Sequence, residues 1–139
     1  MTESEFSFSV PGRAESYSPL NLAYIGDAVF ELYVRTELAR RGNMPVNKLN
    51  KLAREFVKAE SQAKMYYKLV VHLTERELEV LKRGRNASSH TTAKNASVND
   101  YRHATAVEAL FGYLYLCGES GRLAEIFKMC AEGISYGEF

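Results

Sequence analysis

A long apolar segment between Ser18 and Arg41 sets the strongest limit on how this chain can fold. Ser18 followed by Pro19 is typical of a helix start, because a serine hydroxyl accepts hydrogen bonds from free backbone amides and proline suits the first helical position. Gly42-Asn43 predicts the end of the helix. The helix is apolar almost all round. Its surface along Leu20–Leu38 exceeds what one small bundle can cover, so we expect part of it to form a two-fold contact with a second chain.

Helical patterns also occur in most of the chain after this helix. Thr74 and Glu77 have the spacing of a capping box, in which each side chain satisfies a free backbone amide of the other, and this helix should end near Gly84. We expect further helices after Asn47, over Ala59–His72, from Asn99 or Asp100 to Cys117, and after Ser120. No segment has a convincing hairpin pattern. The sequence thus predicts an all-α helical bundle, with a flexible N-terminal segment at 1–17 and one domain at 18–139.

Length and composition restrict the class of protein. With 139 residues, 46% of them hydrophobic, the chain is long enough for one domain with an ordinary core. Cys117 and Cys130 lie in apolar helical surroundings without metal-ligand spacing, so we expect buried, reduced thiols and a cytoplasmic protein. No apolar run approaches the roughly 20 residues of a membrane span, and the acidic, polar segment Met1–Ser18 does not resemble a secretory signal. We therefore expect no membrane association and no export.

Charge is unevenly distributed along the chain. Residues 1–31 hold five carboxylates against the single Arg13, a net charge of −4, whereas residues 82–102 hold five cations against the single Asp100, a net charge of +4. Residues 85–99 lack helical periodicity and are rich in Asn, Ser, Thr and Lys, so we expect a functional loop that, with its basic flank, spans about 83–99. Basic and amide groups suit phosphate and sugar oxygens. The candidate contacts are Lys82, Arg83, Arg85, Asn86, Lys94, Asn95 and Arg102.

Two carboxylates occur inside apolar helical stretches, where soluble proteins seldom place them. These are Asp27 and Glu108, and each needs a hydrogen bond, an ion pair or a cation if it is buried. An ordinary salt bridge or an exposed helix edge would explain them, and Glu31, one turn after Asp27, could share its face. A close pair of carboxylates would instead bind a hard divalent ion, as in phosphodiester hydrolysis. Gly26 costs about 1 kcal/mol of helix propensity, which predicts that another group approaches the backbone there.

Other catalytic designs fit the sequence less well. No serine or cysteine lies on a nucleophile elbow, and the sequence has no glycine-rich phosphate-binding motif. Three histidines lack metal-ligand spacing, and we expect each to be exposed or to have its hydrogen bonds satisfied: His72, His90 and His103. Helical spacing predicts core or interface positions for four tyrosines, Tyr66, Tyr67, Tyr113 and Tyr115.

Two segments together resemble a known family. Residues 22–31, LAYIGDAVFE, resemble the signature helix of the ribonuclease III family, which reads E-F-L-G-D-A-V-L. Residues 104–114, ATAVEALFGYL, resemble its second acidic motif, D-x-x-E-A-L-x-G. The likeness is closest to the bacterial subfamily that lacks a double-stranded-RNA-binding domain, and it covers nearly everything from Leu20 to Leu116. The order of the motifs, their separation and the basic segment between them make the match specific.

The resemblance implies a homodimeric catalytic (endonuclease) domain that cuts double-stranded RNA, with maturation of the large-subunit (23S) ribosomal RNA precursor as its role. Asp27 and Glu108 would be the catalytic residues and the ligands of Mg²⁺, with Mn²⁺ as a substitute. The seven basic and amide residues named above would bind RNA. Larger family members have acids where this chain has Ala23 and Thr105, yet members of the subfamily resemble this chain in both positions and are regarded as active.

Two other functions stay open at this point. The first is a ribonuclease-III-like RNA-binding module with weak or absent catalysis, against which the presence of both Asp27 and Glu108 argues. The second is an unrelated helical metalloenzyme that acts on a small phosphate ester. Such an enzyme would need a closed pocket and no long basic loop.

Overall fold

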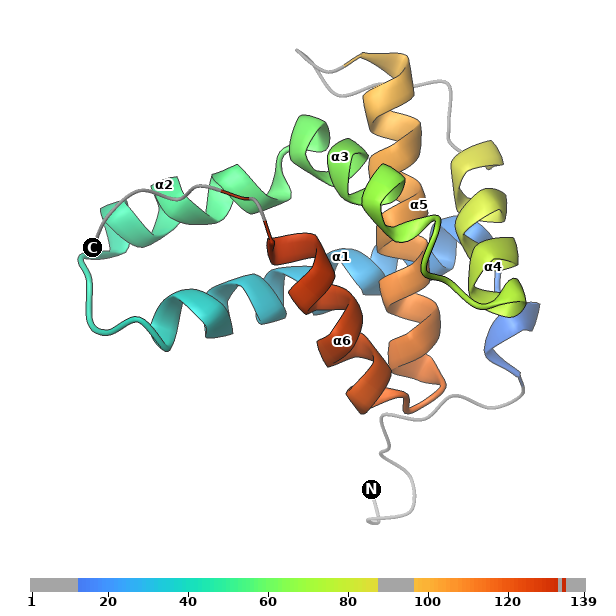
Figure 1. The fold of residues 1–139 in the computed structure, drawn as a ribbon, viewed down its shortest axis with the longest axis horizontal. Coiled ribbons are helices and arrows are strands. Elements are labelled where there is room, and N and C mark those ends of the chain that lie inside the picture. The colour runs from blue at the N-terminus through green and yellow to red at the C-terminus, as the bar shows by residue number, and fades with distance from the viewer. Residues whose placement is uncertain (1–12, 88–96, 133, 135–139) are drawn as a thin grey trace, which may run out of the picture.

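The structure, a computed structural model, describes residues 13–87, 97–132 and 134. Its described part contains helices and no strand, which confirms the all-α prediction (Figure 1). None of its helices is long and apolar enough to cross a membrane. The elements are η2 (Ala14–Ser16, a short 3₁₀ helix), α1 (Pro19–Ala39), α2 (Val46–Val57), α3 (Ala59–Leu69), α4 (Glu75–Asn86), α5 (Val98–Leu116) and α6 (Ser120–Ala131).

The N-terminal segment at 1–17, predicted to be flexible, is ordered at its end. Residues 1–12 lie outside the described part of the chain. Ala14, in contrast, is buried in the core, and its helix η2 packs against α5. The bundle therefore begins a few residues before the predicted boundary at 18.

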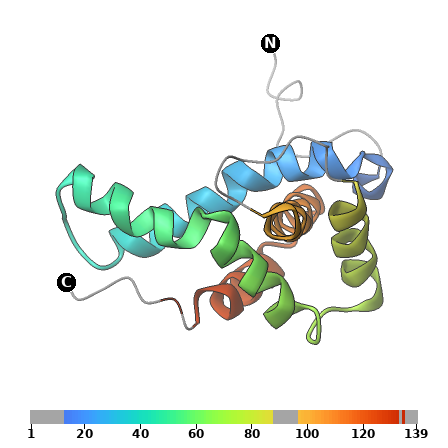
Figure 2. The same cartoon turned by 90° about the horizontal axis from the view of Figure 1, so that it is seen from above.

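Helix α5 is the centre of the bundle. It packs against α1, α3, α4 and α6, and Figure 2, which looks along α5, shows these helices around it. Within the run 103–114, every residue is buried except Glu108, which is half-buried. The most extensive helix–helix contact is that between α1 and α5. Phe30 of α1 also packs edge-on against Phe111 of α5, with ring centroids 5.1 Å apart.

Local signals in the sequence start and stop the helices as predicted. The Ser18 hydroxyl accepts from the Asn21 amide at 3.2 Å, and Pro19 is the first residue of α1. Gly42 follows α1 with φ of +117°, a conformation that residues with a Cβ rarely adopt. The capping box predicted at the start of α4 is present, with both reciprocal hydrogen bonds between Thr74 and Glu77.

The structure shortens the predicted basic loop from both ends. Helix α4 continues past Gly84 to Asn86, so Arg85 is a helical residue and not a loop residue, and Arg83 lies inside the helix. Helix α5 begins at Val98, because the Ser97 hydroxyl accepts from the amide of Asp100 at 3.0 Å and caps the helix. Residues 88–96, the middle of the predicted loop, lie outside the described residues.

Two glycines allow the backbones of α1 and α5 to touch. A Cβ atom on Gly26 would lie 1.6 Å from the carbonyl oxygen of Glu108, and one on Gly112 would lie 1.9 Å from the carbonyl oxygen of Leu22. Each glycine therefore faces the backbone of the other helix, where no side chain fits. This confirms the prediction that another group approaches the backbone at Gly26.

A partly buried ion pair joins α4 to α6. Arg122 donates to both oxygens of Glu77, with Nη2–Oε1 and Nε–Oε2 distances of 2.8 and 2.9 Å. The hydrogen bond from Arg122 is the main reason why the pKa of Glu77 lies below its ordinary value. Glu77 thus serves the helix cap and the tertiary contact together.

The two cysteines differ in exposure. Cys130 is buried in α6, as predicted, and burial raises the pKa of its thiol to about 12. Cys117 is exposed, which corrects the prediction that both are buried. The reason is its place at the end of α5, next to the turn at Gly118, where the chain leaves the core.

Candidate active site

The crossing of α1 and α5 brings together the two carboxylates that the sequence indicated. Asp27 follows Gly26 on α1, and Glu108 is the α5 residue whose carbonyl oxygen faces Gly26. The side chains of Asp27 and Glu108 form a hydrogen bond. Asp27 is exposed and Glu108 is half-buried, so the pair lies at the surface rather than inside the core.

The contact between the two carboxyl groups governs the protonation of Glu108. The pKa of Glu108 is raised to about 8, first by burial, then by the negative charge of Asp27 and by the hydrogen bond to Asp27. Such a bond requires one of the two carboxyl groups to carry a proton, so the raised pKa of Glu108 reflects the pair as a whole. Within the described residues, neither carboxylate forms an ion pair with lysine or arginine. An ordinary salt bridge to lysine or arginine therefore does not account for this pair within the described residues.

A third polar side chain reaches the site from α3. Gln62 is 2% exposed, and its side chain hydrogen-bonds Glu108, an interaction that favours the charged carboxylate. No motif or charge pattern in the sequence singles out this residue. The signal that could have revealed it is helical spacing, because Gln62 shares a buried stripe of α3 with Tyr66 and Leu69.

The donor set at the crossing fits a hard divalent cation that keeps water ligands. Two carboxylates in contact repel each other when both are charged, and a cation between them removes that repulsion. The described residues contain no group of three or more His, Cys, Asp or Glu side chains that could hold a metal. A cation held by Asp27 and Glu108 alone would need water to complete its shell.

Neighbouring positions on the two helices add no ligand. Glu31 accepts from Arg35 at 2.9 Å, so it forms an ion pair within α1 instead of joining Asp27. Ala23 is buried, and the Thr105 hydroxyl donates to the carbonyl oxygen of Tyr101 at 2.9 Å. The two positions that carry acids in larger family members are thus occupied by the apolar Ala23 and by Thr105, whose hydroxyl is hydrogen-bonded to its own helix.

Most of the predicted RNA-contacting residues lie on two helices that flank 88–96. Lys82, Arg83 and Asn86 are exposed near the end of α4, and Arg102 is exposed near the start of α5. Arg85 is half-buried, because its Nη1 donates to the Tyr66 hydroxyl at 2.9 Å. The close packing of Gly84 against α5 holds the two helices together. Lys94 and Asn95 lie outside the described residues.

The histidines and tyrosines partly match the predictions. His103 is buried, with Nδ1 2.6 Å from the carbonyl oxygen of Asn99 and Nε2 3.4 Å from the Tyr67 hydroxyl, so both ring nitrogens have partners, as predicted. His72 is exposed, and His90 lies outside the described residues. Tyr66 and Tyr113 are core residues and Tyr115 is half-buried, but Tyr67 is 62% exposed and is not part of the core.

Comparison with known proteins agrees with this fold. The family model for the Ribonuclease III domain matches residues 20–119, a range that includes both carboxylates and the basic ends of α4 and α5. The chain therefore belongs to the ribonuclease III family and is an endoribonuclease.

Its curated relatives within that family are named Mini-ribonuclease 3. The one from Clostridium tetani is 50% identical over 81% of this chain and 75% of its own length. The one from Brevibacillus brevis is 51% identical over 80% of this chain and 83% of its own length. A crystal structure of a protein from Fusobacterium nucleatum matches with a TM-score of 0.80 at 31% identity, covering 88% of this chain and 98% of that one.

Proposed function

We propose that the chain is a Mg²⁺-dependent enzyme that cleaves double-stranded RNA at the Asp27–Glu108 site. The observation that carries this proposal is the contact between the two carboxyl groups at the α1–α5 crossing. Family membership supplies the reaction type, and the carboxylate pair supplies ligands that suit a hard cation.

The residues of the chain position the reactants. Asp27 and Glu108 would hold the cation from two helices that are fixed against each other by backbone contact at Gly26 and Gly112. When bound, Mg²⁺ supplies Lewis-acid activation of water and stabilises charge on the phosphate oxygens. The exposure of Asp27 leaves one side of the pair open to a ligand as large as an RNA duplex.

The basic surface beside the site is proposed to hold the duplex. This surface consists of Lys82, Arg83, Arg85, Asn86 and Arg102, with Lys94 and Asn95 as further candidates from the segment between the helices. An A-form duplex is recognised mainly through its phosphates, its 2′-hydroxyls and its shape, which cationic and amide side chains can contact. We therefore expect binding that depends little on RNA sequence.

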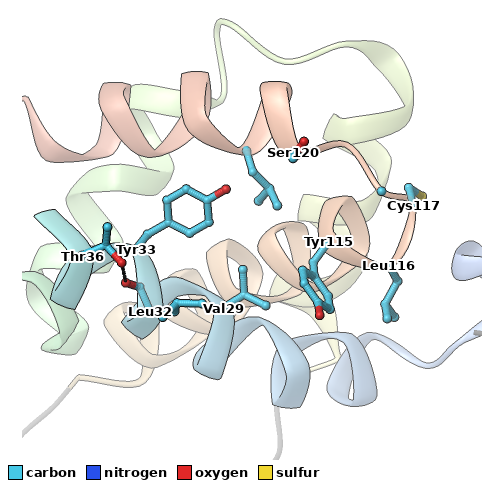
Figure 3. Close-up of a pocket in the computed structure, with 10 residues that line it drawn as sticks. Val29, Leu32, Tyr33, Thr36, Tyr115, Leu116, Cys117 and Ser120 are labelled. Carbon is cyan, nitrogen blue, oxygen red and sulfur yellow. Dashed lines mark hydrogen bonds between the residues drawn. The ribbon is translucent and has the colours of Figure 1, made fainter. Parts of the chain in front are cut away.

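A second copy of the chain is proposed to cover the outer face of α1. Leu20, Tyr24 and Leu32 of α1 are 43%, 81% and 64% exposed, a large apolar surface for a small protein. Beside them lies an apolar groove of about 670 Å³, formed by α1, the end of α5 and the start of α6 (Figure 3). Isologous packing of this face in a homodimer would supply two sites, one for each RNA strand.

The proposed natural substrate is the precursor of large-subunit (23S) ribosomal RNA, processed in the cytoplasm. The similarity to proteins named Mini-ribonuclease 3 supports this choice, since the resemblance to that subfamily implies it. Duplex stems in the precursor would present the A-form surface that the basic residues fit.

The proposal is tested by incubating the purified chain with a long RNA duplex in Mg²⁺ and, separately, in excess chelator. We expect cleavage of both strands in Mg²⁺ and none in chelator, and no comparable cleavage of either strand alone. Binding of the duplex without cleavage in Mg²⁺ would show an RNA-binding module instead. Equal cleavage in chelator would contradict the role of the carboxylate pair as a cation site.

A further inference from the structure

We infer that Gln62 is a positioning residue for the proposed cation site, because its side-chain amide holds the Glu108 carboxylate in place from helix α3. This inference rests on the proposed function, since it assigns a residue that prepares the same site. Gln62 touches neither RNA nor the cation in this account, and it acts through Glu108 alone.

The burial of Gln62 is the first observation that supports this role. It is the only glutamine in the chain and the only polar side chain among the largest fully buried residues of the described core. An apolar side chain of similar volume could fill the same space between α3 and α5 without the desolvation cost of an amide. A buried amide at this position therefore needs a partner, and the partner is Glu108.

The direction of the hydrogen bond is the second observation. The Gln62 side chain stabilises the charged form of Glu108, so its NH₂ group donates to the carboxylate. Of the two carboxyl groups, only Glu108 has this anchor, while Asp27 faces solvent. A donor on the Gln62 side restricts the rotation of the carboxyl group that also contacts Asp27. Partners of this kind, which orient a metal ligand, typically change metal affinity or activity about 10- to 100-fold when removed.

The first test compares Gln62→Met with Met65→Leu. Gln62→Met keeps the length of the side chain and removes the donor, whereas Met65→Leu changes a buried residue of the same helix that serves as a packing control. Calorimetric titration with Mn²⁺ should show an affinity lowered about 10-fold or more for Gln62→Met and unchanged for Met65→Leu. The Mg²⁺ concentration that half-saturates cleavage should rise by the same factor, with the KM for RNA unchanged. Thermal unfolding of the two variants shows whether either substitution changes the packing of the core.

The second test uses the wild-type chain and therefore does not depend on the folding of a variant. Because Gln62 is the only glutamine, ¹⁵N-glutamine labelling gives a single side-chain NH₂ pair in an NMR spectrum. This signal should move saturably when Mg²⁺ is added, and it should not move in the Asp27→Asn variant, which lacks one of the two cation ligands.

The outcomes separate this inference from the proposed function. Wild-type Mn²⁺ affinity in Gln62→Met, or an NH₂ signal that ignores Mg²⁺ at concentrations that support cleavage, would overturn the role of Gln62 alone. A wild-type chain that binds neither Mn²⁺ nor Mg²⁺ would contradict the proposed cation site, and the role of Gln62 with it.

Discussion

Replacement of Gly26 by alanine should weaken the whole bundle, because this glycine sets the distance between α1 and α5. The added Cβ would lie 1.6 Å from the carbonyl oxygen of Glu108, 2.6 Å from its carbonyl carbon and 2.8 Å from the amide nitrogen of Gly112. All three atoms belong to the backbone, so no side chain can rotate away. Ordinary contact begins near 3.4 Å, so the two helices must move apart by an amount of the order of 1.8 Å, the difference between the two distances.

The expected cost follows from this displacement. Overpacking of a core costs about 1–3 kcal/mol, and the rigid backbone contact at Gly26 places the cost at the upper end. Alanine regains about 1 kcal/mol of helix propensity over glycine, which leaves a net loss of about 2 kcal/mol in the free energy of unfolding. With a urea dependence of about 2 kcal/mol/M, the unfolding midpoint should fall by about 1 M.

Urea unfolding followed by far-UV circular dichroism measures this midpoint. Gly121→Ala is the matched control, because Gly121 lies in α6 and a Cβ there meets no heavy atom within 4 Å. The control should keep or slightly raise the midpoint. If Gly26→Ala unfolds at the same urea concentration as the wild type, the close backbone contact between α1 and α5 is wrong.

Three further predictions concern the dimer, the RNA surface and the ion pair between α4 and α6. Leu32→Asp should give a monomer in analytical ultracentrifugation. Val71→Asp, at an apolar residue that is 77% exposed and lies outside α1, should stay dimeric. Two dimers would refute the proposed interface. Arg83→Ala should lower the slope of log RNA affinity against log salt by about 1, and Lys51→Ala on α2 should not; equal slopes would exclude a phosphate contact. Glu77→Gln should reduce the free energy of unfolding at pH 7 by about 1.5–3 kcal/mol. Because the pKa of Glu77 is lowered in the folded state, the full loss of stability should be seen above the ordinary pKa of 4.5. The loss should vanish as the pH falls through the lowered pKa of the folded state. A difference in stability between variant and wild type that persists in acid would refute the assignment to charge.

Features that depend on neighbouring residues could be predicted from the sequence. The cap at Ser18 and the capping box at Thr74 are local arrangements of a few residues, and both are present. Gly26 was informative because glycine is unfavourable in a helix unless another group needs the space. The pairing of Asp27 with Glu108 did not follow from periodicity, and it came from the resemblance of two motifs to one family.

Features that depend on distant residues could not be predicted from the sequence. Gln62 meets Glu108 across 46 positions of the chain, and an uncharged amide on a helix gives no local sign of such a partner. Polar composition predicts a loop from residue 85 onward, whereas Arg85 belongs to the last turn of α4, which it anchors through Tyr66. Asp27 is exposed although its sequence neighbours are apolar, because α5 packs against α1 at the adjacent Gly26 and leaves Asp27 at the edge of this contact.

The most direct test of the account is the cleavage rate of Glu108→Gln on a long RNA duplex in Mg²⁺. The substitution preserves shape and removes a charged ligand, so the rate should fall on the order of 100-fold or more while duplex binding and the unfolding midpoint stay near wild type. Asp27→Asn should behave in the same way. Glu31→Gln is the control, because Glu31 pairs with Arg35 on the same helix and should keep its activity. Near-normal cleavage by Glu108→Gln at limiting Mg²⁺ would contradict the assignment of the active site to this pair of carboxylates.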